Sequence, residues 1–229
     1  MNKVFPFFVI LFFSFLTCFG QQAEVQNGDL LFVGLPVDYA SSSDSSMASA
    51  IIKATRNSDE INYIHVAILE VDENGAIWVI EATLKRGVDR HPLDTFLRDF
   101  TLRNGSLPTL VVKRLKNRRD IVNFVDNAKR FCGRSYDLFF LPDNEEKYCS
   151  ELVRDSYIRN GKHLFSEAPM NFKSEDGTFP PYWVKLFQRI NRPIPQDIPG
   201  TNPNAMFKEK ILRYVGKLNP QAATVDRRQ

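Results

Sequence analysis

Apolar and polar side chains along the chain follow two repeats, the two-residue period of strands and the 3.6-residue period of helices. Extended apolar runs predict β-strands over residues 30–33, 63–71, 76–83 and 107–115. Helical spacing predicts helices over residues 92–100, 119–131, 149–157 and 181–190. No internal repeat or linker divides this pattern, so the chain predicts one domain that mixes strands and helices.

Four further stretches are predicted less specifically. Residues 36–49 form either a loop or the start of a helix that runs through residues 47–55, with Asp44 and Ser45 as candidate caps. Residues 135–140 predict a short extended piece, and residues 206–214 an amphipathic element of open type. Residues 221–229 predict a disordered tail, which leaves residues 21–220 as the folded domain.

The N-terminus carries the pattern of a secretory signal. Lys3 precedes an apolar run over residues 4–16 that is too short for a comfortable transmembrane helix, and small residues precede a cleavage point after Gly20. We therefore expect an exported protein, periplasmic or secreted. The alternative is a degenerate lipoprotein site in which Cys18 is lipidated, and only then do we expect association with a membrane.

Composition narrows the class of protein further. The chain has 229 residues, of which 43% are hydrophobic and 25% charged, as in an ordinary globular domain. The net charge of +3 is too small and too dispersed to predict a nucleic-acid partner. The one dense basic run, residues 114–119, lies between a strand and a helix and is interpreted as a solvated turn.

Cys149 begins the helix predicted over residues 149–157, directly after a polar, turn-forming stretch. A thiol in the first turn of a helix faces the positive end of the helix dipole and unpaired backbone N–H groups, which favour the thiolate form. The position therefore predicts a nucleophile with donors for an oxyanion beside it. The alternative is a small buried apolar residue, the commonest use of a free cysteine.

A histidine and a carboxylate lie on the two strands of the predicted hairpin. Residues 72–75 form the turn, so that His65 and Glu81 are nearly opposite or diagonal and their side chains can reach each other. The alternative is an unrelated pair at a solvent-exposed edge of the sheet.

Together, Cys149, His65 and Glu81 supply the residue types of a nucleophile, a base and a group that orients the base. Of the other two histidines, His91 is assigned to a loop–helix boundary and His163 to the stretch after a helix, so His65 is the preferred base.

The cysteines and histidines lack the spacing of a zinc site, and no metal or cofactor is predicted. Cleavage after Gly20 leaves Cys132 and Cys149. A pair of cysteines in an exported protein can form a disulfide, but their positions favour two free thiols, with Cys132 buried beside Phe131.

The chain resembles the circularly permuted papain-like NlpC/P60 superfamily and, within it, the YiiX/YaeF-like branch of exported permuted amidases. The resemblance rests on five motifs, in the order Gly28-Asp29-Leu30, His65-Val66-Ala67-Ile68, Val79-Ile80-Glu81-Ala82, Gly133-Arg134-Ser135-Tyr136-Asp137 and Tyr148-Cys149-Ser150-Glu151-Leu152-Val153. The cysteine follows the histidine along the chain, as in the permuted members, whereas ordinary papain-like enzymes have the reverse order.

This resemblance implies an α+β fold in which a small antiparallel sheet or open barrel packs on the Cys149 helix. It also implies that Cys149 is the nucleophile, His65 the base and Glu81 the third polar residue, and that Tyr148 lines the substrate site.

The implied function is that of an exported thiol hydrolase acting on an amide bond. The candidate substrates are a peptide, a peptidoglycan fragment, and an N-acyl amino acid or lipid amide. The alternatives are a lipid-directed thiol acyltransferase or acylhydrolase and an inactive binding module of the same fold.

Overall fold

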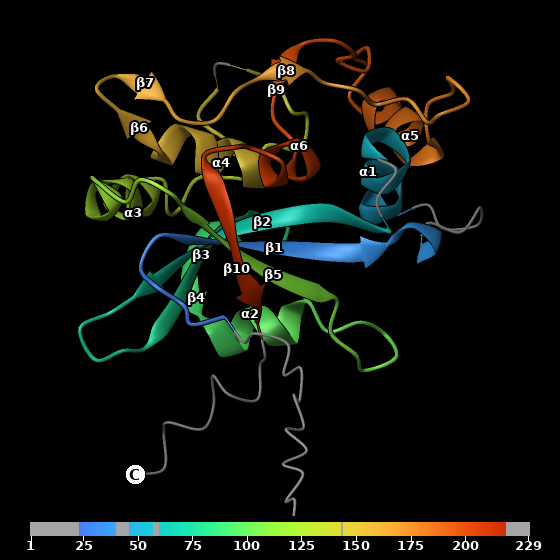
Figure 1. Cartoon of the computed structure of the whole chain (residues 1–229). Helices are drawn as coiled ribbons and strands as arrows, with labels where there is room; N and C mark the ends of the chain where they lie inside the picture. The colour runs from blue at the N-terminus through green and yellow to red at the C-terminus, as the bar shows by residue number, and fades with distance from the viewer. Residues whose placement is uncertain (1–22, 40–45, 57–59, 143, 219–229) are drawn as a thin grey trace, which may run out of the picture.

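A computed structural model describes residues 23–39, 46–56, 60–142 and 144–218. The expected signal sequence (1–20), with Cys18, and the expected tail (221–229) lie outside the described residues. The core is a six-stranded antiparallel sheet in the order β10–β5–β1–β2–β3–β4 (Figure 1). Its strands are β1 (Asp29–Pro36), β2 (Ile61–Val71), β3 (Ile77–Thr83), β4 (Gly87–Pro92), β5 (Thr109–Leu115) and β10 (Leu212–Lys217).

The helices are α1 (Met47–Thr55), α2 (Leu93–Asp99), α3 (Ile121–Arg130), α4 (Cys149–Ser156), α5 (Pro181–Arg189) and α6 (Pro203–Phe207), with a 3-10 turn at Val37–Tyr39. Two small sheets pair β6 (Ile158–Arg159) with β7 (Lys162–His163) and β8 (Ala168–Pro169) with β9 (Pro199–Gly200). The structure thus has the expected α+β class, and it assigns the open stretch 206–214 to the ends of α6 and β10.

Both faces of the central strands are apolar, and helices cover each face (Figure 1). Leu30 and Phe32 of β1 face the side that packs against α3 and α4, whereas Leu31 and Val33 face the side that packs against α2. Burial on both sides explains why the strands are near-continuous apolar runs. A third cluster joins α1 and α5 to the chain around α4 through the side chains of Ala50, Phe140, Tyr148, Phe172, Trp183 and Phe187.

A buried ion pair links β1 to β5 and corrects the interpretation of the basic run 114–119. The Arg114 guanidinium binds both oxygens of Asp29, at 2.6 and 2.7 Å, and Arg118 lies 3.5 Å from the same carboxylate. Arg114 is buried, because Asp29 compensates its charge. Beside this pair, the Tyr157 hydroxyl donates to the Gly28 carbonyl at 2.9 Å and holds the end of α4 on β1.

Three local features differ from the expectations. The segment after the hairpin forms the edge strand β4, which the polar sequence of residues 87–91 did not predict. The N-cap of α1 is Ser46, whose side chain accepts from the Ser49 N–H; the predicted caps Asp44 and Ser45 lie outside the described residues. Residues 135–140 are irregular apart from a bridge between Tyr136 and Lys147. No helix in the described ranges is long and apolar enough to cross a membrane.

Candidate active site

The site lies where β2 and β3 separate. The two strands pair only from Ile68 with Ile80 to Val71 with Ile77. Beyond Ile68, β2 continues to pair with β1, and beyond Ile80, β3 continues to pair with β4. The inner edges of β2 and β3 are therefore free of each other from this point, which leaves room for side chains between the strands.

His65 and Glu81 meet in this opening. The His65 Nε2 atom lies 2.6 Å from Glu81 Oε2, and both side chains are almost inaccessible to solvent. If the observed register is continued, Glu81 is diagonal to His65, one of the two relations that the hairpin predicted. Burial raises the pKa of Glu81, but the hydrogen bond from His65 and the nearby His91 ring outweigh it and hold the pKa below its ordinary value.

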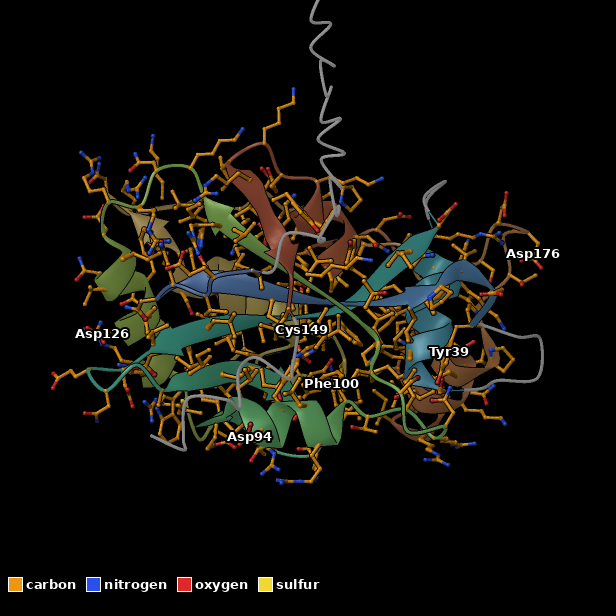
Figure 2. The ribbon with its side chains drawn as sticks, turned by 60° about the horizontal axis from the view of Figure 1, so that its bottom comes forward. Tyr39, Asp94, Phe100, Asp126, Cys149 and Asp176 are labelled. Carbon is orange, nitrogen blue, oxygen red and sulfur yellow. The ribbon has the colours of Figure 1, made fainter. Side chains whose placement is uncertain are left out.

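Cys149 is the first residue of α4 and lies near the centre of the molecule (Figure 2). It is buried and lines a cavity of about 150 Å³ together with His65, Thr83, Phe100 and Tyr136. Burial alone lowers the pKa of His65. The charge of Cys149 and hydrogen bonds with Cys149 and Glu81 outweigh that effect and raise the pKa to about 10. The arrangement therefore favours the protonated imidazolium form of His65, between Cys149 and Glu81.

A buried network fixes the first turn of α4. The Tyr148 N–H donates to Glu151 Oε2 at 3.3 Å, and Lys147 lies 3.2 Å from Glu151 and 3.0 Å from Asp155. Burial, partly offset by Lys147, raises the pKa of Glu151 to about 7. These contacts fix the orientation of the helix start, and with it the position of Cys149.

Tyr148, which the resemblance placed at the substrate site, is buried and connects α4 to the C-terminal part of the chain. Its hydroxyl accepts from the Thr201 N–H at 3.0 Å and contacts the Met170 sulfur at 3.8 Å. A side chain at Gly200 would collide with that sulfur, which explains the glycine. Tyr148 also lines a second cavity beside Cys149.

This second cavity is smaller, about 50 Å³, and largely apolar. Besides Cys149 and Tyr148, its walls include Ile51, Phe140, Met170, Phe172 and Trp183. Cys149 thus lies between a wider, open cavity on the side of His65 and a narrow apolar one on the side of α5.

Sequence reasoning did not assign a role to Tyr136, although the residue stands in one of the five motifs. Tyr136 lines both cavities that adjoin Cys149. Burial and the charge of Cys149 raise the pKa of its phenol well above the ordinary value, so the hydroxyl remains a hydrogen-bond donor. The next residue, Asp137, fixes the loop by accepting from the N–H groups of Phe139 and Leu141.

The assignment of His91 to a loop–helix boundary was wrong. His91 lies in β4, is buried, and places its Nε2 atom 3.3 Å from Glu81 Oε1. The segment looked like a loop because its residues are polar, yet β4 pairs with β3 along its whole length. His163, in contrast, is exposed in the two-residue strand β7.

Cys132 and Cys149 are both free thiols, as predicted, but Cys132 is exposed and not buried. It follows the end of α3, where the chain turns towards Gly133. Partial burial and the charge of Asp89 raise the pKa of its thiol above the ordinary value.

Comparison with known proteins identifies the family to which the chain belongs. Residues 24–216 match the family model described as permuted papain-like amidase enzyme, YaeF/YiiX, C92 family. The chain belongs to this family. The uncharacterized protein YiiX of Escherichia coli K12 is 27% identical over 197 residues, which cover 85% of this chain and 87% of the relative.

A solved structure agrees with this assignment. The crystal structure titled "metalloprotein yiiX" from Escherichia coli O157:H7 matches with a TM-score of 0.63 and 26% identity, over 85% of this chain and 98% of that chain. Family membership supports a cysteine hydrolase or amidase as the general class of activity.

Proposed function

We propose that this family member is an exported cysteine amidase that uses Cys149 as nucleophile, His65 as general base and acid, and Glu81 to orient His65. One observation carries the proposal: the buried His65 ring interacts with Cys149 on one side and lies 2.6 Å from Glu81 on the other. A thiolate held by an imidazolium is the activated nucleophile of papain-like hydrolysis.

In the first half of the reaction, the Cys149 thiolate attacks the carbonyl carbon of the amide and forms a C–S bond. The developing oxyanion accepts hydrogen bonds from the N–H groups of the first turn of α4, which lack acceptors within the helix, and from the Tyr136 hydroxyl. The tetrahedral intermediate then collapses, the C–N bond breaks, and the His65 imidazolium gives its proton to the leaving amine. A thioester on Cys149 and a neutral imidazole result.

In the second half, the neutral imidazole takes a proton from water, and the resulting hydroxide attacks the thioester carbon. The C–S bond breaks, the carboxylic acid leaves, and the thiolate–imidazolium pair is restored. Glu81, held below its ordinary pKa, remains ionised and stabilises the imidazolium in both halves.

The two cavities support one orientation of the substrate. His65 must reach the leaving amine, so the amine occupies the wider cavity that His65 lines with Thr83, Leu84 and Phe100. The acyl part then points towards the narrow cavity formed by apolar and aromatic side chains. This favours an amide whose acyl part is apolar, such as an N-acyl amino acid or a lipid amide, over a polar cell-wall peptide.

The same apolar cavity supports a second candidate, acyl transfer from a lipid ester or amide to another acceptor. In that case an amine or alcohol, and not water, resolves the thioester. A third reading, an inactive binding module, predicts that neither reaction occurs.

The proposal contains no metal step. The described residues contain no group of three or more His, Cys, Asp or Glu side chains arranged to hold a metal ion. Instead, His65 and His91 direct ring nitrogens at the two oxygens of Glu81, which is an arrangement of ion pairs. We therefore expect EDTA to leave hydrolysis unchanged, and a loss that zinc restores would contradict the thiol mechanism.

The decisive experiment incubates the mature protein with cell-wall peptides, N-acyl amino acids and lipid amides. Amine release measures hydrolysis, and mass spectrometry of tryptic peptides detects the acyl group. We expect an acyl adduct on Cys149 with apolar acyl groups, none in Cys149→Ala, and no change in Cys132→Ala. Retained cleavage in Cys149→Ala, or an adduct on Cys132, would overturn the assignment.

Export is part of the proposal and rests on the N-terminal sequence pattern. Mass spectrometry of the exported protein should find an N-terminus at Gln21. A lipidated Cys18 would instead show that the protein is anchored to a membrane.

A further inference from the structure

Glu81 is enclosed between two histidines. Its Oε2 atom lies 2.6 Å from the Nε2 atom of His65, and its Oε1 atom lies 3.3 Å from the Nε2 atom of His91. The carboxylate is 1% exposed and the His91 side chain 6% exposed. Each carboxylate oxygen therefore faces an imidazole nitrogen on a different strand, β2 and β4.

His65 alone would neither compensate the buried charge of Glu81 fully nor fix the rotation of its carboxylate. A carboxylate buried to this degree is costly to ionise unless several polar groups compensate its charge. With one partner it could also rotate about its last bond and present either oxygen. The His91 ring, whose Nε2 atom has no hydrogen-bond partner and lies 3.3 Å from Oε1, is a second group that compensates the charge and leaves Oε2 directed at His65.

We propose that His91 is a positioning residue of the site, which holds Glu81 ionised and aimed at His65. The inference rests on the proposed function, since it gives Glu81 its role through His65. His91 touches neither Cys149 nor the cavity that the substrate would occupy, and it acts only through the carboxylate.

The chain of contacts from His65 through Glu81 to His91 continues to the surface of the protein. The other ring nitrogen of His91, Nδ1, lies 3.3 Å from Asp89 Oδ2, and Asp89 lies 3.9 Å from Arg86. The charged groups facing His91 are thus Glu81 from β3 and Asp89 from its own strand, with Arg86 behind Asp89. Burial lowers the pKa of His91, but Glu81 and Asp89 outweigh it and raise the pKa above the ordinary value, which favours a proton on both nitrogens.

The test compares His91→Leu, which removes both nitrogens, with His91→Gln, whose side-chain amide can still donate to Glu81. His163→Leu is the matched control, because His163 is an exposed histidine on another strand. NMR titration of the His65 ring gives its pKa. The rate of Cys149 alkylation by iodoacetamide at pH 6, read by peptide mass spectrometry, gives the reactivity of the thiol.

In His91→Leu, Glu81 takes up a proton more readily or turns away, so the pKa of His65 falls. We expect a fall of about one unit, from about 10 to about 9; at pH 6 the ring stays protonated in both proteins, so alkylation there should change little. His91→Gln should recover most of the difference, and His163→Leu should match the wild type. A folded His91→Leu with an unchanged His65 pKa would overturn the inference.

A measurement on the unmodified protein keeps the inference testable if His91→Leu does not fold. Nitrogen-15 NMR at pH 7 should show a proton on His91 Nε2, the atom that faces Glu81. A neutral ring with its proton on Nδ1 would contradict the proposal. The proposed function fails separately, if wild-type Cys149 proves no more reactive than Cys132 at pH 6.

Discussion

The two halves of the β2–β3 hairpin differ in what lies between the strands. Near the turn, Ile68 to Val71 pair with Ile77 to Ile80, and Ile68 and Ile80 are fully buried among apolar side chains. Farther from the turn, each strand pairs with its other neighbour, and the opening holds His65 and Glu81. The first half contributes apolar burial, whereas the second holds the charges.

The difference shows how one hairpin can serve both stability and chemistry. A charged pair in a fully paired strand segment would be surrounded by apolar groups without space for a third partner. Separation of the strands admits Cys149 from α4 at one side of His65, while β4 brings His91 to the far side of Glu81. Mutations in the two halves should therefore affect different properties.

The largest effect is expected at Cys149 of α4, which faces the half of the hairpin where β2 and β3 are not paired. Cys149→Ala should reduce turnover of the amide identified in the substrate screen by about 10⁶-fold, the scale seen when a hydrolase loses its nucleophile. Because alanine fits the same space, the circular dichroism spectrum should stay close to that of the wild type. Cys132→Ala, which removes the exposed thiol, is the control and should retain full turnover.

In the paired half, Ile80→Ala should destabilise the fold by about 2–5 kcal/mol, since it removes a fully buried side chain from the core. Urea unfolding measures the loss. Below the unfolding transition, the pH profile of Cys149 alkylation should remain that of the wild type. A shifted profile would show that the two halves are not independent.

Glu81→Gln changes a residue in the half of the hairpin where β2 and β3 are not paired, and its expected effect on turnover is smaller than that of Cys149→Ala. Glutamine keeps the shape but removes the charge that stabilises the imidazolium, and a hydrogen bond to a charged group is worth about 1.5–3 kcal/mol. Turnover should thus fall by roughly 10–100-fold, and the pKa of His65 should fall with it in an NMR titration. Wild-type turnover in Glu81→Gln would remove Glu81 from the mechanism.

The last effect concerns stability against pH. The pKa of His65 is raised from 6.5 to about 10 in the folded protein. The corresponding stabilisation is fully present below about pH 6.5 and is lost as the pH rises towards 10. Unfolding midpoints should decline over that range, and less so in Cys149→Ala, which lacks the partner that raises the pKa of His65 most. An equal decline in both proteins would count against the ion pair.

Much of the fold could be predicted from the sequence, because apolar periodicity reports burial. The hairpin turn at residues 72–75 also sufficed to bring His65 near Glu81, and the polar stretch before Cys149 marked a helix start. The edge strand β4 was not predicted, because an edge strand tolerates polar side chains and so lacks the apolar pattern of the central strands. Since β4 was not predicted, neither was the position of His91 beside Glu81.

Contacts between distant segments could not be predicted in this way. Tyr148 binds the Thr201 N–H, 53 residues along the chain, and Arg114 binds Asp29 across 85 residues. Neither partner leaves a local pattern in the sequence. Cys132 was misplaced for a related reason: helical spacing suggested a buried position, but α3 ends at Arg130 and the chain turns the thiol outward.

Competition between the two thiols tests the central claim most directly. The mature protein and its His65→Ala variant are treated with limiting iodoacetamide at pH 6, and peptide mass spectrometry measures alkylation of Cys149 and Cys132. If His65 holds Cys149 as a thiolate, the buried Cys149 should react first in the wild type, although Cys132 is the exposed thiol. His65→Ala should abolish that preference. Faster reaction of Cys132 in the wild type, or an unchanged preference in His65→Ala, would contradict the account.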